Sequence, residues 1–192
     1  YLQSCNPAIF SVKDVGIMIA AIQSLSSEYS AVRQLISCLQ PIISHHNNSA
    51  SAEDIERMLP GFINLDSKHE EVRRLIGAFN DLLEHCSGSF HVGSIAKALK
   101  AMQHKSRASD EVSRMFSLLS KKVLAGNEPL SPSHIASSVN ALRYCTDKNL
   151  SISACAVIAI RIQRADNSTS LLSMSLNQVA VALKGFQFVS DD

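Results

Sequence analysis

Apolar residues recur along this chain at a constant interval of about 40 residues, which lies in the range of helical-repeat proteins. Each copy opens with a large apolar residue, and two more follow it four and seven residues later, with a small residue just before the last one. The opening positions are Val15, Ile55, Ile95, Ile135 and, after a slightly longer interval, Val179. The small positions are Ala21, Gly61, Ala101, Ala141 and Gly185. This spacing is one face of an α-helix, so each copy predicts a helix. The small residue predicts a point where two helix axes approach closely.

A second apolar pattern follows the first in each copy. Its anchors, which keep the same interval, are Val32, Val72, Val112 and Ile152. Further apolar residues stand three, four and seven positions after each anchor, as Leu35, Ile36 and Leu39 do after Val32, and in the fourth copy these are Cys155, Ala156 and Ala159. The pattern predicts a second helix in every copy.

Capping residues mark the start of the first helix in four copies. Ser11 with Asp14, Ser51 with Asp54, and Ser175 with Gln178 have the spacing of a capping box, and Ser131 before Pro132 is typical of an N-cap followed by a proline at the first helical position. Each copy is therefore predicted to be a helix, a short turn, a second helix and a loop.

A repeat of two helices about 40 residues long predicts an all-α fold, namely a right-handed α-solenoid. The expected single domain spans residues 1–192, with repeats at about 11–50, 51–90, 91–130 and 131–174 and a partial repeat at 175–192. A single hairpin cannot bury enough apolar surface to fold alone, so stacking on its neighbours must supply the rest. The alternative is an irregular helical bundle.

The composition narrows the classes of partner. The chain has 46% hydrophobic and 18% charged residues and a formal net charge of +1, so there is no general field to attract nucleic acid. Its five cysteines have neither zinc-site nor disulfide spacing.

The apolar runs at 17–22 and 154–160 are too short to span a membrane and predict either core between repeats or a docking surface. The chain starts at Tyr1 without a signal pattern, so any targeting segment is expected outside it.

The repeat resembles one found in algae with complex plastids, whose pattern is close to asparagine-alanine-leucine-tyrosine-glycine-leucine-glutamine. Residues 181–187 and 97–103 carry the resemblance, together with Glu71-Val72-Arg73 and the linker at 128–131. The repeat is similar in plan to octotricopeptide and heptatricopeptide repeats, which are organellar and often bind RNA. The resemblance implies an organellar location, with a plastid favoured over a mitochondrion.

Candidate chemistry is sparse in the sequence. His45-His46 and His85-Cys86 with His91 lie at the ends of second helices, where they could be metal ligands, but helix C-terminal histidines favoured by the dipole are the preferred interpretation. We find neither a nucleophile-elbow pattern nor a phosphate-binding loop. The sequence therefore predicts no catalytic residue, cofactor or metal, and a protein that is not an enzyme.

These observations favour a scaffold or linker subunit that makes protein–protein contacts in a large organellar assembly. A photosystem–antenna complex of an alga is one candidate, and the protein would then lie beside a membrane complex without a transmembrane segment of its own. The alternatives are an organellar RNA-binding factor, including a mitochondrial ribosome subunit, and a transient assembly chaperone. The predicted partner-binding residues are Arg57, Lys97, Lys100, Asn140 and Lys184 on the concave face, and Ile17.

Overall fold

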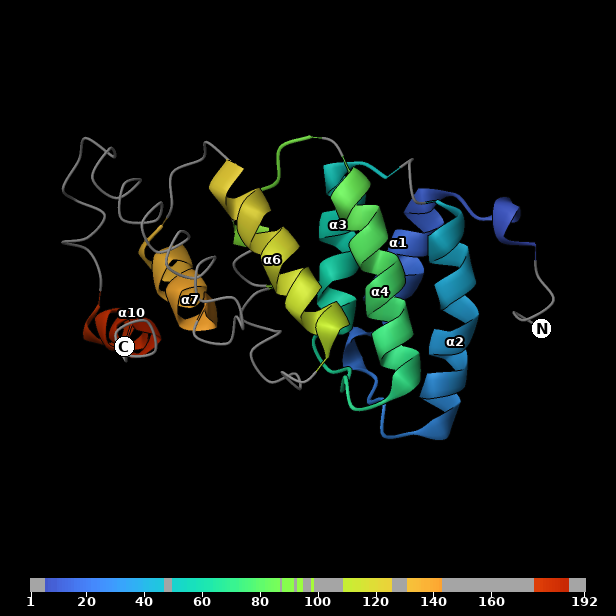
Figure 1. The fold of residues 1–192 in the computed structure, drawn as a ribbon, viewed down its shortest axis with the longest axis horizontal. Coiled ribbons are helices and arrows are strands. Elements are labelled where there is room, and N and C mark those ends of the chain that lie inside the picture. The colour runs from blue at the N-terminus through green and yellow to red at the C-terminus, as the bar shows by residue number, and fades with distance from the viewer. Residues whose placement is uncertain are drawn as a thin grey trace.

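The computed structural model describes residues 6–46, 50–86, 88–91, 93–94, 98, 109–125, 131–142 and 175–186. Over these ranges the chain forms α-helices and 3-10 helices and no β-strand, which confirms the all-α class (Figure 1). The elements are η2 (Pro7–Ile9), α1 (Val12–Ala21), η3 (Ile22–Ser24), α2 (Ser30–His45), α3 (Ala52–Met58), η4 (Leu59–Phe62), α4 (Glu70–His85), α6 (Asp110–Ala125), α7 (Pro132–Leu142) and α10 (Leu176–Phe186).

The second helices keep the interval of the sequence repeat closely. Helices α2, α4 and α6 have 16 residues each and begin at positions 30, 70 and 110. They lie side by side, with α4 between the other two (Figure 1). Residues 71–80 and 111–120 also show the same succession of buried, half-buried and exposed side chains. The helices predicted from Val32, Val72 and Val112 are confirmed, whereas the one predicted from Ile152 lies outside the described residues.

The first helices of the first two units differ from the prediction at their C-terminal ends, whereas α7 and α10 include Leu142 and Phe186 as predicted. Helix α1 gives way to η3 at Ile22, and α3 gives way to η4 at Leu59, so Ile22 and Phe62 lie in 3-10 turns and not in the α-helix that their spacing suggested. In the second unit the cause is Pro60, which has no N–H to donate to the preceding turn. The tighter turn still buries Ile22 and Phe62.

The predicted caps are present. Ser11 and Asp14, and likewise Ser51 and Asp54, form reciprocal capping boxes at the starts of α1 and α3. The Ser175 hydroxyl accepts from the Gln178 N–H at 3.3 Å while the Gln178 side chain accepts from the Ser175 N–H at 2.8 Å. In each case the side chain satisfies a backbone donor that the helix itself leaves free.

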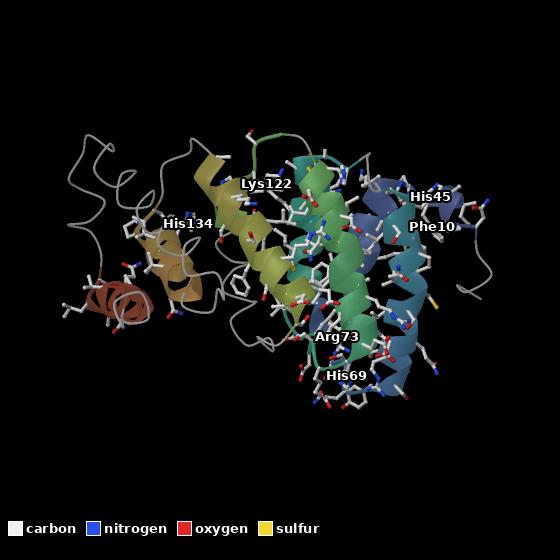
Figure 2. The ribbon with its side chains drawn as sticks, in the orientation of Figure 1. Phe10, His45, His69, Arg73, Lys122 and His134 are labelled. Carbon is white, nitrogen blue, oxygen red and sulfur yellow. The ribbon has the colours of Figure 1, made fainter. Side chains whose placement is uncertain are left out.

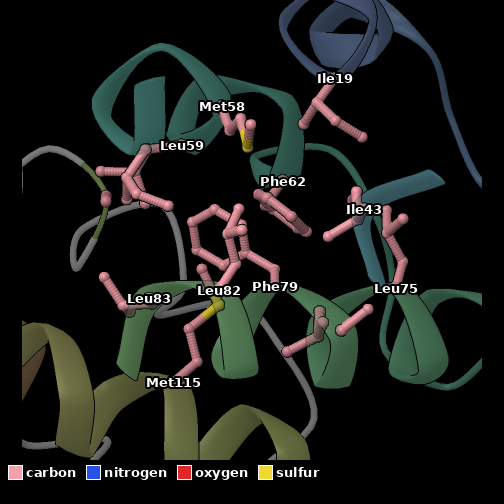
Figure 3. Close-up of a cluster of buried hydrophobic side chains, with 14 of the residues drawn as sticks. Ile19, Ile43, Met58, Leu59, Phe62, Leu75, Phe79, Leu82, Leu83 and Met115 are labelled. Atoms are coloured by element: carbon pink, nitrogen blue, oxygen red, sulfur yellow. The ribbon is translucent and has the colours of Figure 1, made fainter. Parts of the chain in front are cut away.

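The core lies between two layers, one made of α1 and α3 and the other of α2, α4 and α6. Figure 3 shows Met58 and Phe62 reaching from the first layer toward Phe79 and Leu82 on α4. The Phe62 and Phe79 rings are 4.7 Å apart between centroids, and both side chains are buried. Burial of such aromatic side chains is among the largest favourable contributions in a helical core.

Close approach at the small-residue position is confirmed for the second unit. Gly61 packs directly against the backbone of Ile19 in the first unit, where a side chain would not fit. Ala101 lies outside the described residues. Further along the chain, α7 and α10 pack against one another at the end of the molecule opposite to α1 and α2 (Figure 1).

Candidate interaction surfaces

Arg57, on α3, is the best-defined of the predicted partner-binding residues. Its guanidinium group lies 2.8 Å from Glu53 and 3.5 Å from Asp54, both on the same helix. Its aliphatic stem covers Gly16 of α1, since a Cβ built on Gly16 would lie 3.4 Å from Arg57 Cδ. The stem of Arg57 therefore contacts the first unit, while two carboxylates of its own helix neutralise the charge of its guanidinium group.

Of the other four basic or polar candidates, Asn140 is the one whose side chain lies within the described part of the chain. Lys97 and Lys100 lie outside the described residues. Lys184 belongs to α10, but its side chain is outside the description, and Asn140 is a half-buried residue of α7. The predicted concave cluster is thus represented by Arg57 and Asn140, on helices of different units.

Ile17, the apolar residue among the predicted partner-binding residues, has an exposed side chain. It lies on α1 with 53% of its surface accessible, while Val15, Ile19 and Ile22 around it are buried. The apolar run at 17–22 is therefore core on one side and exposed surface on the other. The other apolar run, at 154–160, lies outside the described residues.

The histidine pairs lie at the ends of second helices. His45 and His46 end α2 with their rings 5.2 Å apart, and His85 Nδ1 lies 2.8 Å from the carbonyl oxygen of Asp81 one turn earlier. Across the described ranges, no three His, Cys, Asp or Glu side chains are grouped so that they could hold a metal ion. The His85 contact is local to its helix, which fits the dipole interpretation.

In the first two units, an arginine that follows the anchoring valine ties the second helix to the turn before it, a feature that sequence reasoning missed. Arg33 Nη1 donates to the carbonyl oxygens of Ser27 and Glu28, both at 2.8 Å. Arg73 Nη1 repeats the contact at the equivalent position of the next unit, donating to Ser67 at 3.1 Å and to Lys68 at 2.9 Å. Figure 2 shows Arg73 at the N-terminal end of α4, beside His69. The constant position after Val32 and Val72 was the signal that could have found them.

Polar contacts also join neighbouring units along the edge of the stack. The Asp66 N–H donates to the Ser27 hydroxyl at 2.8 Å, and the Asn64 side-chain amide donates to the Gln23 carbonyl at 2.6 Å. Lys68 Nζ lies 2.6 Å from Glu28, and this hydrogen bond lowers the pKa of the Glu28 carboxyl and raises the pKa of Lys68. Much of the charge at this edge therefore serves contacts between units.

Polar contacts also join α4 of the second unit to α6 of the third. The buried Asn80 amide donates to the Glu111 carbonyl at 2.8 Å. Arg114 of α6 reaches back to Asp81 at 2.8 Å and also pairs with Glu84. The hydrogen bond from Arg114 lowers the pKa of Glu84. These contacts fix the register of one second helix against the next.

A groove of about 280 Å³ crosses the layer of first helices. Its walls come from three successive units and are Gln23, Glu56, Leu59, Pro60, Ile63, Ser94 and Ala98. Glu56 accepts hydrogen bonds from the Ser94 hydroxyl at 3.2 Å and from the His91 N–H. The carboxylate thus connects the second and third units, and the groove offers a mainly apolar floor beside it.

No helix within the described ranges is both long enough and apolar enough to cross a bilayer. The chain matches no protein-family model, no curated protein and no solved structure.

Proposed function

We propose that this chain is a right-handed α-solenoid that works as a non-enzymatic scaffold, making protein–protein contacts in a large organellar assembly. The observation that supports this proposal is that charged side chains pair with one another, both within units and between neighbouring units. Arg57, the predicted concave-face cation, is held by Glu53 and Asp54, and Lys68 and Arg114 are paired with carboxylates of neighbouring units. A surface whose cations are paired internally offers little to a phosphate backbone.

The solenoid itself is supported by the second helices. Successive units of the repeat make the same kind of contact with the next unit, as α2 does with α4 and α4 with α6. In such proteins each unit contacts only its neighbours, and the long faces remain free for partners. Broad protein surfaces of this kind are typical of scaffolds.

The organellar location, and the plastid in particular, rests on the resemblance to the algal repeat described above. Within that resemblance, a subunit linking a photosystem to its antenna is our leading candidate. The proposal predicts a fixed set of protein partners and no requirement for RNA.

The test is native purification of the tagged full chain from its organism, with and without nuclease, followed by mass spectrometry. Partners retained after nuclease treatment would support the scaffold and identify the assembly. Loss of the partners, or recovery of one defined transcript, would overturn it in favour of RNA binding. Arg57→Gln serves as a control, because an RNA groove would lose affinity and show weaker salt dependence, whereas the scaffold should keep its partners.

A further inference from the structure

Glu56 brings a negative charge into the groove that crosses the layer of first helices. Its carboxylate accepts hydrogen bonds from the Ser94 hydroxyl at 3.2 Å and from the His91 N–H, and both donors are neutral. Within the ranges that the structure describes, no Lys, Arg or His side chain forms an ion pair with this carboxylate. The two carboxylates earlier on the same helix differ in this respect, because Arg57 pairs with both of them.

The two neutral donors orient the Glu56 carboxylate and leave part of it available. An ionised carboxylate has about four acceptor positions on its two oxygens, and each oxygen of Glu56 accepts one hydrogen bond. The side chain is half-buried in the wall of the groove. Hydrogen bonds between oppositely charged groups are about twice as strong as neutral ones. The groove therefore favours a ligand with a positive charge.

The floor beside Glu56 fits the aliphatic part of such a ligand. Its apolar side chains range from buried to exposed, and they are Leu59, Ala98, Pro60 and Ile63. Lysine and arginine lay their methylene stems along apolar surface of this kind and keep the charged end at a polar group. An inorganic cation would gain nothing from the apolar floor, and the carboxylate would repel a phosphate.

The size of the groove agrees with the insertion of a side chain. Its volume of about 280 Å³ is just below the range of about 300–1,000 Å³ for sites that hold drug-sized molecules. Gln23 is an exposed residue of the wall. Its amide can both donate to and accept from a peptide backbone next to the inserted side chain. These features favour a basic side chain that is part of a polypeptide over a free organic cation.

The chain holds basic side chains of its own in the same manner. Lys122 Nζ lies 5.3 Å from the centre of the Phe90 ring and donates to the Cys86 carbonyl oxygen at 2.8 Å. The Arg57 stem covers Gly16 while its guanidinium group meets carboxylates. In both cases an apolar surface carries the stem and an oxygen receives the charge. The groove offers the same two parts, and none of its described lining residues is Lys or Arg.

We propose that this groove receives a lysine or arginine side chain of a partner protein, with Glu56 as the acceptor of its charge. The inference deepens the proposed function and rests on it, because it assigns one protein-binding site of the scaffold and the chemistry of the partner. The two can fail separately. Binding of a basic ligand by the purified chain needs no assembly, and capture of partners in the organism can depend on other surfaces.

The test is an NMR titration of the purified full chain, labelled at its methyl groups, with N-acetyl-arginine N-methylamide and its lysine counterpart. N-acetyl-norleucine N-methylamide is the matched probe, because it has an aliphatic stem without the charge. We expect the methyl signals of Leu59, Ile63 and Ala98 to shift with a dissociation constant on the order of 1 mM, as for a ligand of this size. The neutral probe should bind at least about threefold more weakly.

Glu56→Gln should weaken the binding of the basic probes at least about threefold, since the amide keeps the shape of the side chain without its charge. Glu53→Gln is the matched control. Glu53 lies on the same helix, pairs with Arg57, has an 82% exposed side chain and is not part of the groove lining. This variant should leave the dissociation constant unchanged, and circular dichroism would check that both variants fold.

Three results would overturn the proposal. One is the absence of shifts in these methyl signals at probe concentrations on the order of 10 mM. Another is equal affinity for the basic and neutral probes in the wild type, or equal affinity of the wild type and Glu56→Gln for the basic probes. The third is binding that appears only when Lys97→Gln and Lys100→Gln are combined, which would show that a lysine of the same chain fills the groove.

Discussion

Gly61 of the second unit lies in direct contact with the main chain of Ile19 in the first. A Cβ built on Gly61 would be 2.0 Å from the Ile19 carbonyl oxygen and 2.7 Å from its carbonyl carbon. Backbone atoms cannot move aside as a flexible side chain can, so the two helices can approach this closely only with glycine at this position.

Gly61→Ala is therefore expected to force α3 away from α1. We expect the free energy of unfolding, measured by urea titration, to fall by about 1–3 kcal/mol, the usual cost of overpacking. Gly77→Ala is the matched control, because a Cβ there would lie 3.7 Å from Glu111 Cγ, an ordinary contact, inside helix α4. The control should keep its stability or gain about 0.5–1 kcal/mol. Equal losses in both variants would contradict the close approach.

The helical repeat could be predicted because its signal is local. Apolar residues three, four and seven positions apart define a helix face whatever the neighbours are, and Val32, Val72 and Val112 mark three helices that the structure contains. The 3-10 turns at Ile22 and Phe62 could not be predicted in this way, because a 3-10 turn and an α-helix bury much the same positions over so short a stretch. Pro60 was the available local signal for the second of them.

Arg73→Met tests the contact that ties α4 to the turn before it. Arg73 donates to the Ser67 and Lys68 carbonyl oxygens and is half-buried. Methionine keeps the apolar stem but leaves both acceptors without this donor. We expect a loss of about 1.5–3 kcal/mol in the free energy of unfolding, the range for hydrogen bonds to charged groups.

The neighbouring Arg74 provides the control for that measurement. It is exposed and pairs with Glu70 one turn earlier on the same helix. Arg74→Met should change stability by no more than about 0.5 kcal/mol, as surface pairs of this spacing do. If both variants lost the same amount, the carbonyl contacts of Arg73 would have no special weight.

The candidate interface was harder to predict than the fold, and Arg57 shows why. Its place in the repeat identified it as a cation on the first helix, but charge alone does not reveal whether a guanidinium is free. Its two carboxylate partners, Glu53 and Asp54, stand four and three residues before it, so the local pairing was readable from the helix period. The packing of Arg57 over Gly16 could not be read from the sequence, because that contact depends on how the units stack.

The pairing of Arg114 with Glu84 predicts a dependence of stability on pH. The pKa of Glu84 in the folded chain lies below its ordinary value of 4.5 because Arg114 donates to the carboxylate. The contribution of this ion pair to the free energy of unfolding is therefore complete above the ordinary pKa of Glu84 and is lost as the pH falls through its lower pKa in the folded chain. We expect Arg114→Gln to lose less stability than the wild type between pH 6 and pH 3, measured by thermal unfolding at each pH.

Lys68 provides the contrasting case on the alkaline side. Glu28 raises the pKa of Lys68, so the alkaline loss of this pair comes as the pH rises through the folded value above 10.5, while Lys68 also lowers the pKa of Glu28 and the pair is lost at acid pH as well. Because this pair joins other units than Arg114 does, Lys68→Gln should leave the difference between wild type and Arg114→Gln at acid pH unchanged. The same acid loss in wild type and Arg114→Gln would show that the pair between α4 and α6 does not stabilise the fold.

Phe79→Ala tests whether the two layers form one core. Phe79 is fully buried, and its ring lies 4.7 Å from that of Phe62 across the layers. Truncation should lower the free energy of unfolding by about 3–5 kcal/mol, since it removes apolar contact and leaves a cavity. Tyr29→Ala is the matched control, because Tyr29 is also aromatic but 69% exposed, and it should cost about 0.5 kcal/mol or less. Because the second unit lies between the first and the third, the Phe79→Ala variant should also lose cooperativity in urea, seen as a lower slope of the transition. An unchanged slope with a large loss of stability would mean that the neighbouring units still unfold together with the second.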